Sequence, residues 1–402
     1  HRDLHSFPTR RSSDLYYGKW AKWRDASIED IKKELESGTP FVIRLYSQGN
    51  IDNQFTLIDL VKGNLTLREN DMDSVLLKSD GFPTYHLAHP IDDTLMGISF
   101  VLRGDEWYSS VPLHIELFKA LGFEQISYGH FSPMMKIDEE TGGKRKLSKR
   151  KDPESDVQYY ISNGYPIEAV KEYLLNIANS NFYDWRKQNP EKELKEFEVK
   201  LEKLNKSGAL FDMIKLNDVC KDYISRLDAK TVYDNVLDWS KEFNSDLYTQ
   251  MVEHKDYFVS IFGIEREGSK VRKDIVKWSD VPNLIDIFFK ESFEAIDTPT
   301  LEMDKETQKN ILSDFMDIYH PGDTVEEWFG KVKNVATKNN FCTDYKEYEA
   351  NPKKYKGKVG DVAMLLRVAI THKFQSPDLY QVMQVLGEEV VLSRLKNYKD
   401  SL

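Results

Sequence analysis

Cysteine and long apolar runs are both scarce in this chain of 402 residues. Its two cysteines, Cys220 and Cys342, lie far apart, so they form neither a disulfide framework nor the paired spacing of a metal site. No stretch approaches the roughly 20 consecutive apolar residues of a membrane-spanning helix. These absences exclude a disulfide-rich secreted protein and a membrane partner, and they favour a cytoplasmic protein in a reducing compartment.

Positive charge is also in deficit, because 67 acidic residues outnumber 56 basic ones and the formal net charge is −11. An acidic total argues against indiscriminate DNA binding, although local basic patches can still hold a polynucleotide. Hydrophobic residues make up 40% of the chain and aromatic residues 12%, an ordinary globular composition. The length suits two or three domains.

The first 15 residues, HRDLHSFPTRRSSDL, do not begin with methionine and have no apolar run long enough for a signal peptide. They show neither helical nor strand periodicity, and the pattern of a folded protein begins at Tyr16. We therefore expect residues 1–15 to be a non-native artefact, with a native disordered tail as the alternative.

Residues 16–72 are predicted to form a small unit with one helix and several β segments. The helix is SIEDIKKELESG at 27–38, and TPFVIRLYS at 39–47 is typical of a strand. FTLIDLVKGNLTLRE, at 55–69, reads as two short strands around a Lys-Gly-Asn turn at 62–64.

Strands and a helix alternate in the next stretch. SVLLK at 74–78 and ISFVLRG at 98–104 are predicted strands, and an apolar segment follows at 126–137. Between the last two lies a helix for which Ser110 is a candidate N-cap and Gly122 the end. This alternation predicts a parallel α/β sheet.

The chain becomes helical after about residue 156, so the fold class is α/β followed by all-α. Predicted helices include 165–180, 231–243 and a last one at 376–387, capped by Ser376 and Pro377 and stopped by glycine. The charged stretch 187–206 reads as a solvated helix or a linker.

A concentrated basic loop, GGKRKLSKRKDPES, occupies 142–155, and six of its residues from Lys144 to Lys151 are basic. The simplest reading is a solvated charge run or a localisation patch. Two glycines and a Lys-Leu-Ser-Lys core favour instead a mobile flap that binds a triphosphate, because lysine ammonium groups act as point charges on phosphate oxygens. The loop follows a predicted strand, where doubly wound sheets tend to bind nucleotides.

Three stretches together resemble glutamyl-tRNA synthetase, a family of class I aminoacyl-tRNA synthetases. They are GFPTYHLAHPIDDTLMGISFVLRGDEW at 81–107, KLSKR at 146–150 and GDVAMLLRVAITHKFQSPDLYQVMQVLG at 360–387. The resemblance implies a glutamate–tRNA ligase, which uses ATP with Mg²⁺ to form glutamyl-adenylate from L-glutamate and transfers glutamate to the 3′-terminal ribose of tRNA(Glu). Whether tRNA(Gln) is also a partner stays open.

The same resemblance implies the domain organisation. Residues 16–72 would be part of an inserted unit that binds the acceptor end, and 73–165 the second half of a Rossmann-like catalytic domain. A helical stem-contact region at 166–240 and a helical anticodon-binding domain at 241–402 would follow. The family's His-Ile-Gly-His signature does not occur in the 402 residues, so we expect an N-terminally truncated fragment that is inactive alone.

Site residues follow from the resemblance residue by residue. Lys149, supported by Lys146, would contact the ATP phosphates as the catalytic pair, and Arg103 would hold the glutamate carboxylate bidentately. His89 stands where many members have asparagine. Each role has a purely structural alternative. Arg103 would be an arginine that snorkels from the strand end, and Tyr85 and Met135 would only fill space in the packing. Arg367 would be a surface arginine without an RNA contact. The expected sets are Lys146, Leu147, Ser148, Lys149, Arg150, Glu106 and Met135 for ATP, Tyr85, His89 and Arg103 for glutamate, and Arg367 for tRNA.

A metal site at His86 and His89 with Asp92 and Asp93 is not expected. The two histidines would share a face only on a helix, and Pro90 biases the residue before it away from the α region. Asp92 or Asp93 is expected to cap the next helix, and no zinc site is evident.

Two rival functions are weighed against glutamate–tRNA ligase. Glutaminyl-tRNA synthetase has a similar catalytic core, but that family ends in β-barrels where this chain reads as helices. A non-catalytic RNA-binding protein derived from a synthetase would fit the missing signature, whereas the intact Lys-Leu-Ser-Lys loop argues against it.

Overall fold

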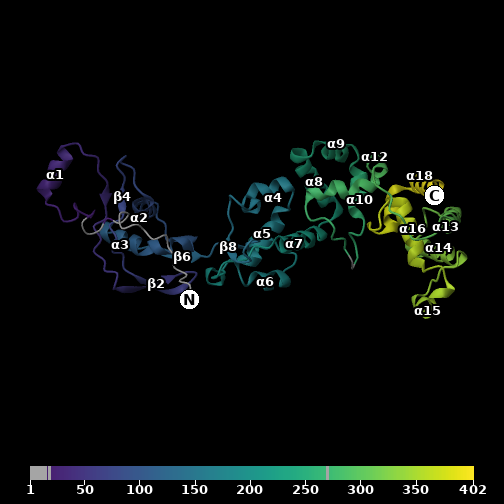
Figure 1. Ribbon diagram of the computed structural model, residues 1–402, viewed down its shortest axis with the longest axis horizontal. Coiled ribbons are helices and arrows are strands. Elements are labelled where there is room, and N and C mark those ends of the chain that lie inside the picture. Colours follow the sequence, from purple (N-terminus) through teal and green to yellow (C-terminus); the bar gives the residue numbers. More distant parts are fainter. Residues whose placement is uncertain (1–15, 17–19, 269–270) are drawn as a thin grey trace. The chain divides into compact units, whose positions relative to one another are not determined.

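The computed structural model describes residue 16, residues 20–268 and residues 271–402 (Figure 1). The predicted artefact at 1–15 lies outside the described residues. The chain divides into two compact units. The first unit contains the described residues up to Ser148 together with Leu174–Phe211, and the second contains Lys149–Tyr173 together with Asp212–Leu402.

A four-stranded mixed sheet organises the first unit, with the strand order β3-β2-β6-β5. Strands β2 (Gln54–Asp59) and β3 (Gly63–Arg68) form the predicted antiparallel hairpin. Strands β5 (Phe100–Gly104) and β6 (Ser127–Phe131) are parallel, and α3 (Val111–Leu121) connects them. The predicted strand–helix–strand alternation is confirmed, because parallel neighbours need such a crossover. Since β2 also pairs with β6, the hairpin belongs to the same sheet.

Helix α3 has the predicted end but not the predicted cap. Gly122 closes it in the left-handed conformation with φ of 71°, which glycine adopts without a Cβ clash. Ser110 makes no side-chain capping bond, because a 3₁₀ turn at Asp105–Ser110 leads directly into the helix. The residues that α3 buries are Val111, Leu113, His114, Leu117 and Phe118.

Two predicted strands are shorter than expected. The strand at 39–47 is reduced to β1 (Ile43–Arg44), which pairs with β4 (Val75–Leu77). The apolar segment 126–137 divides into β6 and β7 (Met135–Ile137), with Pro133 between them. Proline cannot donate a ladder hydrogen bond, and β7 pairs instead with β8 (Lys144–Lys146).

Helix α2 (Tyr85–Leu95) runs through Pro90, so the expectation that Pro90 keeps the residue before it out of the α region is wrong. His86 and His89 both lie on this helix, and Asp92 and Asp93 lie inside it rather than capping another one. Proline in a helix removes one backbone bond. The helix continues despite that loss, and His89 and Pro90 are its buried residues. Helix α1 (Ile28–Glu36) begins as predicted, with Ser27 as its N-cap.

Helices make up the regular structure of the second unit, and a continuous apolar core extends through them from Ile224 to Tyr398. Helix α5 (Ile167–Ala178) contributes to both units, and α6 (Phe182–Gln188) belongs to the first. The helices of the second unit are α4 (Val157–Asn163), α7 (Met213–Ser225), α8 (Ala229–Phe243), α9 (Ser245–Glu253), α10 (Lys255–Gly263), α11 (Val281–Ile285), α12 (Lys290–Glu294), α13 (Lys305–Ile318), α14 (Val325–Lys338), α15 (Tyr345–Ala350), α16 (Val359–Thr371), α17 (Leu379–Leu386) and α18 (Glu388–Ser401).

One prediction for this helical part needs correction. The helix at 376–387 is α17, and its N-cap is Asp378, whose side chain accepts from the Gln381 amide. It is followed by α18, so it is not the last helix. The charged stretch 187–206, predicted as a solvated helix or a linker, agrees with the linker alternative. Beyond α6 it contains two short 3₁₀ turns, Leu194–Glu196 and Leu201–Lys203. Among the described residues, no helix combines the length and apolarity needed to cross a bilayer.

The N-cap of α7 offers a test of the second unit. The Asp212 carboxylate accepts from the amides of Ile214 and Lys215, so Asp212→Ala should destabilise the helix by about 1 kcal/mol. The matched control is Asp218→Ala on the same helix, where an exposed pair with Lys221 contributes little. Hydrogen exchange of the α7 amides measures both, and equal exchange in the two variants would contradict the capping role.

Candidate active site

Arg103 lies at the carboxyl end of β5, where its side chain is buried. The parallel register places it opposite His130 on β6. In open α/β sheets this end of parallel strands is where ligands bind. The position therefore agrees with the predicted carboxylate-binding role of Arg103.

The guanidinium of Arg103 has uncharged hydrogen-bond partners. Its Nε donates to His130 Nε2 at 3.1 Å, and its Nη1 lies 3.3 Å from Tyr85 Oη. Nη1 and Nη2 each lie 3.4 Å from His114 Nδ1. Its carbon is 4.7 Å from the ring centre of Tyr128. Within the described residues the guanidinium forms no ion pair with a carboxylate, an unusual state for a buried cation.

The structure brings the three predicted glutamate-binding residues together. Tyr85 and His89, both on α2, have stacked rings with centroids 5.7 Å apart, and Tyr85 reaches Arg103. His89 is buried between Tyr128, 2.8 Å from its Nε2, and Asp93, 2.6 Å from its Nδ1. Tyr85 is 45% exposed, so it forms the open side of this group.

His89 and three further histidines, His86, His114 and His130, cluster around Arg103, and burial lowers the pKa of each. The strongest effect is on His114, whose pKa falls to about 2 because it is buried among the other histidines and Arg103. The positive charge of Arg103 also lowers the pKa of His86, His89 and His130. These rings are therefore neutral at pH 7, and Arg103 supplies the positive charge of the group.

Asp59, at the end of β2, binds the Nδ1 side of the His130 ring, opposite the Nε2 atom that contacts Arg103. Its carboxylate lies 2.6 Å from His130 Nδ1 and accepts backbone amide bonds from Val61 and Lys62. Burial alone would raise the pKa of Asp59, but the hydrogen bonds from Lys62, His130 and Val61 lower it overall. Asp59 therefore carries a buried negative charge.

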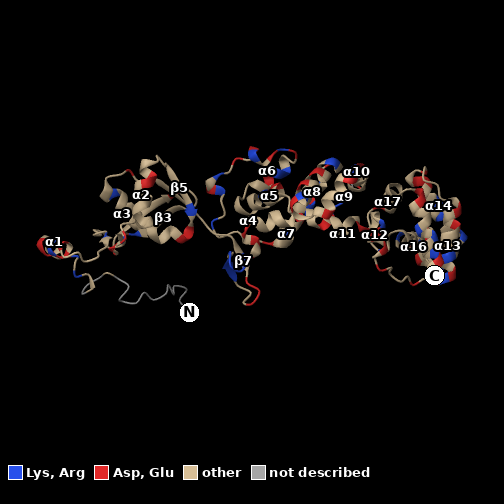
Figure 2. Ribbon diagram, turned by 90° about the horizontal axis from the view of Figure 1, so that it is seen from above, with Lys and Arg blue, Asp and Glu red and all other residues tan. Residues whose placement is uncertain are grey.

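Three of the predicted ATP-binding residues are close together at the β7–β8 hairpin, whose basic residues appear blue beside the β7 label in Figure 2. Lys146 Nζ donates to Glu106 Oε1 at 2.9 Å, and this bond lowers the pKa of Glu106. Met135 is the register partner of Lys146. Gly142, at the tip of the hairpin, has φ of 68°, a conformation that suits glycine.

The remaining flap residues follow β8. Leu147 and Ser148 are half-buried at the end of the first unit, and the Leu147 amide donates to the Met134 carbonyl at 2.9 Å. Lys149 and Arg150 are exposed in a turn that belongs to the second unit.

Arg367, predicted to contact tRNA, is half-buried on α16. Its Nη1 donates to the carbonyls of Ser376 and Pro377, both at 3.0 Å, and to the Ser376 hydroxyl. Burial lowers its pKa. It lines a cavity of about 450 Å³ together with Phe329, whose ring is partly exposed.

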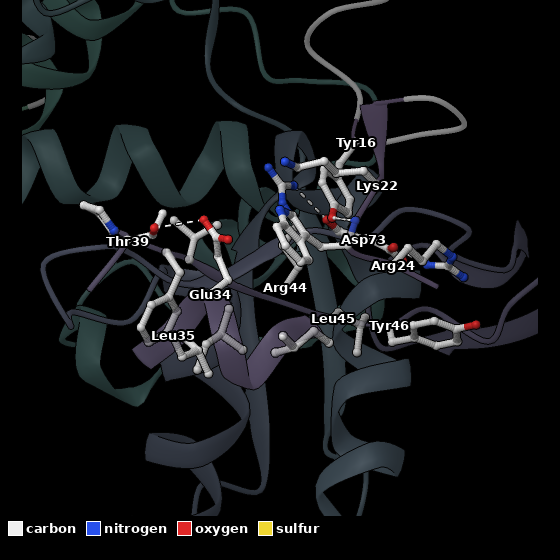
Figure 3. Close-up of a pocket in the computed structure, with 16 residues that line it drawn as sticks. Tyr16, Lys22, Arg24, Glu34, Leu35, Thr39, Arg44, Leu45, Tyr46 and Asp73 are labelled. Atoms are coloured by element: carbon white, nitrogen blue, oxygen red, sulfur yellow. Dashed lines mark hydrogen bonds and ion pairs between the residues drawn. The ribbon is translucent and has the colours of Figure 1, made fainter. Parts of the chain in front are cut away.

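A separate pocket of about 730 Å³ lies beside α1 and β1 in the first unit (Figure 3). Arg24 pairs with Asp73 and lies over the Tyr46 ring at 4.0 Å, and Arg44 lies over the Tyr16 ring at 4.5 Å. None of the predicted catalytic or glutamate-binding residues lines it.

Sequence reasoning missed Asp59, His114 and His130. A polar residue inside a predicted apolar strand was the clue to His130, since a parallel β5–β6 pair puts it beside Arg103. His114 gave no such clue, because it lies among the leucines of α3. Asp59 lies beside His130 only because β2 pairs with β6.

Two family profiles match different parts of the chain. The family profile described as "tRNA synthetases class I (E and Q), catalytic domain" matches residues 13–218, and one described as "Anticodon binding domain" matches 231–399. The chain is 44% identical to the glutamate–tRNA ligase of Clostridium perfringens and 45% identical to that of Clostridium beijerinckii. Each alignment covers 95% of this chain and 70% of the relative.

A solved structure shows the same fold. The crystal structure of a glutamate tRNA ligase from Elizabethkingia meningosepticum, in complex with its amino acid, matches with a TM-score of 0.66 and 24% identity. The match covers 94% of this chain and 72% of that one.

The buried histidines predict an acid-sensitive first unit. Each lowered pKa means that the unfolded chain takes up protons below about pH 6.5, the ordinary histidine value, before the folded chain does. Stability is thus full above that pH and falls below it, and the slope approaches about 1.4 kcal/mol per pH unit for His114, whose folded pKa of about 2 lies far below the unfolded value. Urea unfolding at a series of pH values, followed by NMR of the first unit, should show a shallower fall for His114→Gln, and an equal slope would contradict the assignment.

Proposed function

The chain belongs to the glutamate–tRNA ligase family of class I aminoacyl-tRNA synthetases, and we propose that its residues bind L-glutamate and ATP for the formation of glutamyl-adenylate. Glutamate then passes from the adenylate to the 3′-terminal ribose of tRNA(Glu). The observation that carries the proposal is the buried guanidinium of Arg103, which has only uncharged hydrogen-bond partners within the described residues.

A buried guanidinium is stable when an anion neutralises it. The side-chain carboxylate of L-glutamate supplies that anion, and the planar fork of arginine matches the two carboxylate oxygens. The Tyr85 hydroxyl lies beside this edge, and His89 holds the Tyr85 ring by stacking. The neutral histidines around Arg103 leave it as the cation that selects a carboxylate over an amide.

Activation requires the α-carboxylate of glutamate to attack the α-phosphorus of ATP, with pyrophosphate leaving. The task of the protein is to place positive charge on oxygens that gain negative charge in the transition state. We assign this role to Lys149, with Lys146 in support and Mg²⁺ accompanying ATP. Leu147, Ser148 and Arg150 would complete the flap.

Glu106 and Met135 are assigned to the adenosine part of ATP. Their nearness to Lys146 supports a common site. Lys146 and Glu106 expose 57% and 49% of their side chains. An exposed ion pair contributes little stability, so the lysine is free to exchange Glu106 for a phosphate oxygen.

The tRNA would be bound at several places. The α1 pocket, with arginines over tyrosine rings, offers the side chains that meet unstacked RNA, which supports an acceptor-end unit at 16–72. Residues 166–240 would contact the stem, and 241–402 would read the anticodon, with Arg367 beside Phe329 as one contact. Recognition of tRNA(Gln) as well is an open extension, and the two unpaired cysteines suit a cytoplasmic location.

The flap assignment is tested by Lys149→Ala in an active ligase that contains this chain. We expect the rate of glutamyl-adenylate formation to fall by orders of magnitude with a much smaller change in ATP affinity, because the charge acts mainly in the transition state. ATP–pyrophosphate exchange measures both quantities. Lys151→Ala, in the same exposed turn, is the control, and an unchanged rate for Lys149→Ala would refute the assignment.

The glutamate assignment is tested by Arg103→Lys. This change keeps the positive charge and removes the two-pronged donor, so the affinity for L-glutamate should fall about tenfold or more. The KM for glutamate in pyrophosphate exchange, measured in the same active ligase as Lys149→Ala, reports the change. Arg68→Lys, at an exposed position of β3, is the control, and the same KM in both variants would overturn the role of Arg103.

A further inference from the structure

The hydrogen bonds around Arg103 have a direction that its chemistry determines. A guanidinium can only donate, and an ionised carboxylate can only accept. His130 Nε2 therefore accepts from Arg103 Nε at 3.1 Å, so the neutral ring carries its proton on Nδ1. That proton is donated to Asp59 Oδ2 at 2.6 Å.

The same argument assigns the proton positions of the histidines near the Nη groups of Arg103. His114 Nδ1 accepts from the two Nη groups, so its proton lies on Nε2. His114 Nε2 then donates to His86 Nδ1 at 3.0 Å. A directed chain thus runs from Asp59 through His130 to Arg103, and another runs from Arg103 through His114 to His86.

Asp59 is the fixed end of the first chain. Its side chain is 0% exposed. Backbone amides hold its carboxylate, with Val61 at 2.9 Å, Lys62 at 2.8 Å and His130 at 3.1 Å. Three backbone donors on one carboxylate keep it ionised and in place. Its orientation is consequently transmitted to the His130 ring.

The two ends of the Arg103 guanidinium are held unequally. The Nε bond to His130 has an ordinary length, whereas the Nη contacts, at 3.3 to 3.4 Å, are long and two of them share one acceptor. Long shared contacts are weak. A carboxylate with two oxygens can displace them, while it gains nothing by competing for Nε.

We propose that Asp59 and His130 are positioning residues that fix the Nε side of Arg103, so that the substrate carboxylate binds end-on to the Nη1–Nη2 edge. The inference rests on the proposed function for the identity of the carboxylate. It adds the two residues that orient the guanidinium and the edge that the ligand uses. Neither residue touches the substrate, so both act through Arg103.

The test uses the 402-residue chain labelled with ¹⁵N and a matched pair of uncharged variants. In the parent chain, histidine ¹⁵N shifts should show the proton of His130 on Nδ1, and the Arg103 Nε–H should exchange slowly. His130→Phe removes the acceptor and should speed that exchange and weaken L-glutamate binding about ten- to a hundredfold. His130→Gln keeps a carbonyl acceptor and should restore most of both, while His254→Phe, exposed in the second unit, should change neither.

A second variant covers the case in which His130→Phe does not fold. Asp59→Asn can donate to His130 Nδ1, which releases the ring to carry its proton on Nε2 and should deprive Arg103 Nε of its acceptor. The proposal is overturned if His130 carries its proton on Nε2 in the parent chain, or if both variants leave Arg103 Nε–H protected. If the parent chain fails to bind L-glutamate, the proposed function loses its substrate assignment, whereas the proton position and the Arg103 exchange still decide the positioning role.

Discussion

The first unit depends on a buried guanidinium that the described residues surround with neutral acceptors. Arg103 is inserted between Tyr128, His114 and His130, and the negative charge of Asp59 reaches it only through a histidine. A direct carboxylate partner would neutralise the charge and close the site. Neutral imidazoles instead satisfy single donors and leave the positive charge uncompensated, which is the condition for binding an anionic side chain.

Burial keeps the histidines around Arg103 neutral. Desolvation lowers the pKa of all four histidines, and the charge of Arg103 lowers them further. The rings therefore stay acceptors for Arg103 and do not become competing cations. Asp59 keeps its charge in the same interior because backbone amides of the β2–β3 turn bind it. The sheet therefore sets the charges of the side chains in the site as well as their positions.

The residues proposed to bind the ATP phosphates follow the opposite design. Lys146 and Glu106 are about half exposed, and Lys149 and Arg150 lie in an exposed turn. Such charges are screened by water and held weakly, so they can change partners when a nucleotide arrives. A rigid buried cation for the amino acid and exchangeable surface cations for the nucleotide fit a reaction in which the amino acid is held while phosphate charge moves.

Local sequence features were enough to predict the strand–helix–strand alternation around Arg103 and the helical second half, because apolar periodicity and the helix-ending Gly122 do not depend on distant residues. The flap at 146–150 stays a prediction from the basic Lys-Leu-Ser-Lys loop. The family resemblance predicted Tyr85, His89 and Arg103 as glutamate-binding residues, and the structure brings the three together. The tertiary structure was needed to show that α2 continues through Pro90. It also showed that the apolar segment 126–137 divides into β6 and β7, with β7 paired to β8 instead of the main sheet. It also decided that Asp59, His114 and His130 surround Arg103. These outcomes arise from contacts between residues up to 71 positions apart, where packing energy, rather than local propensity, selects the conformation.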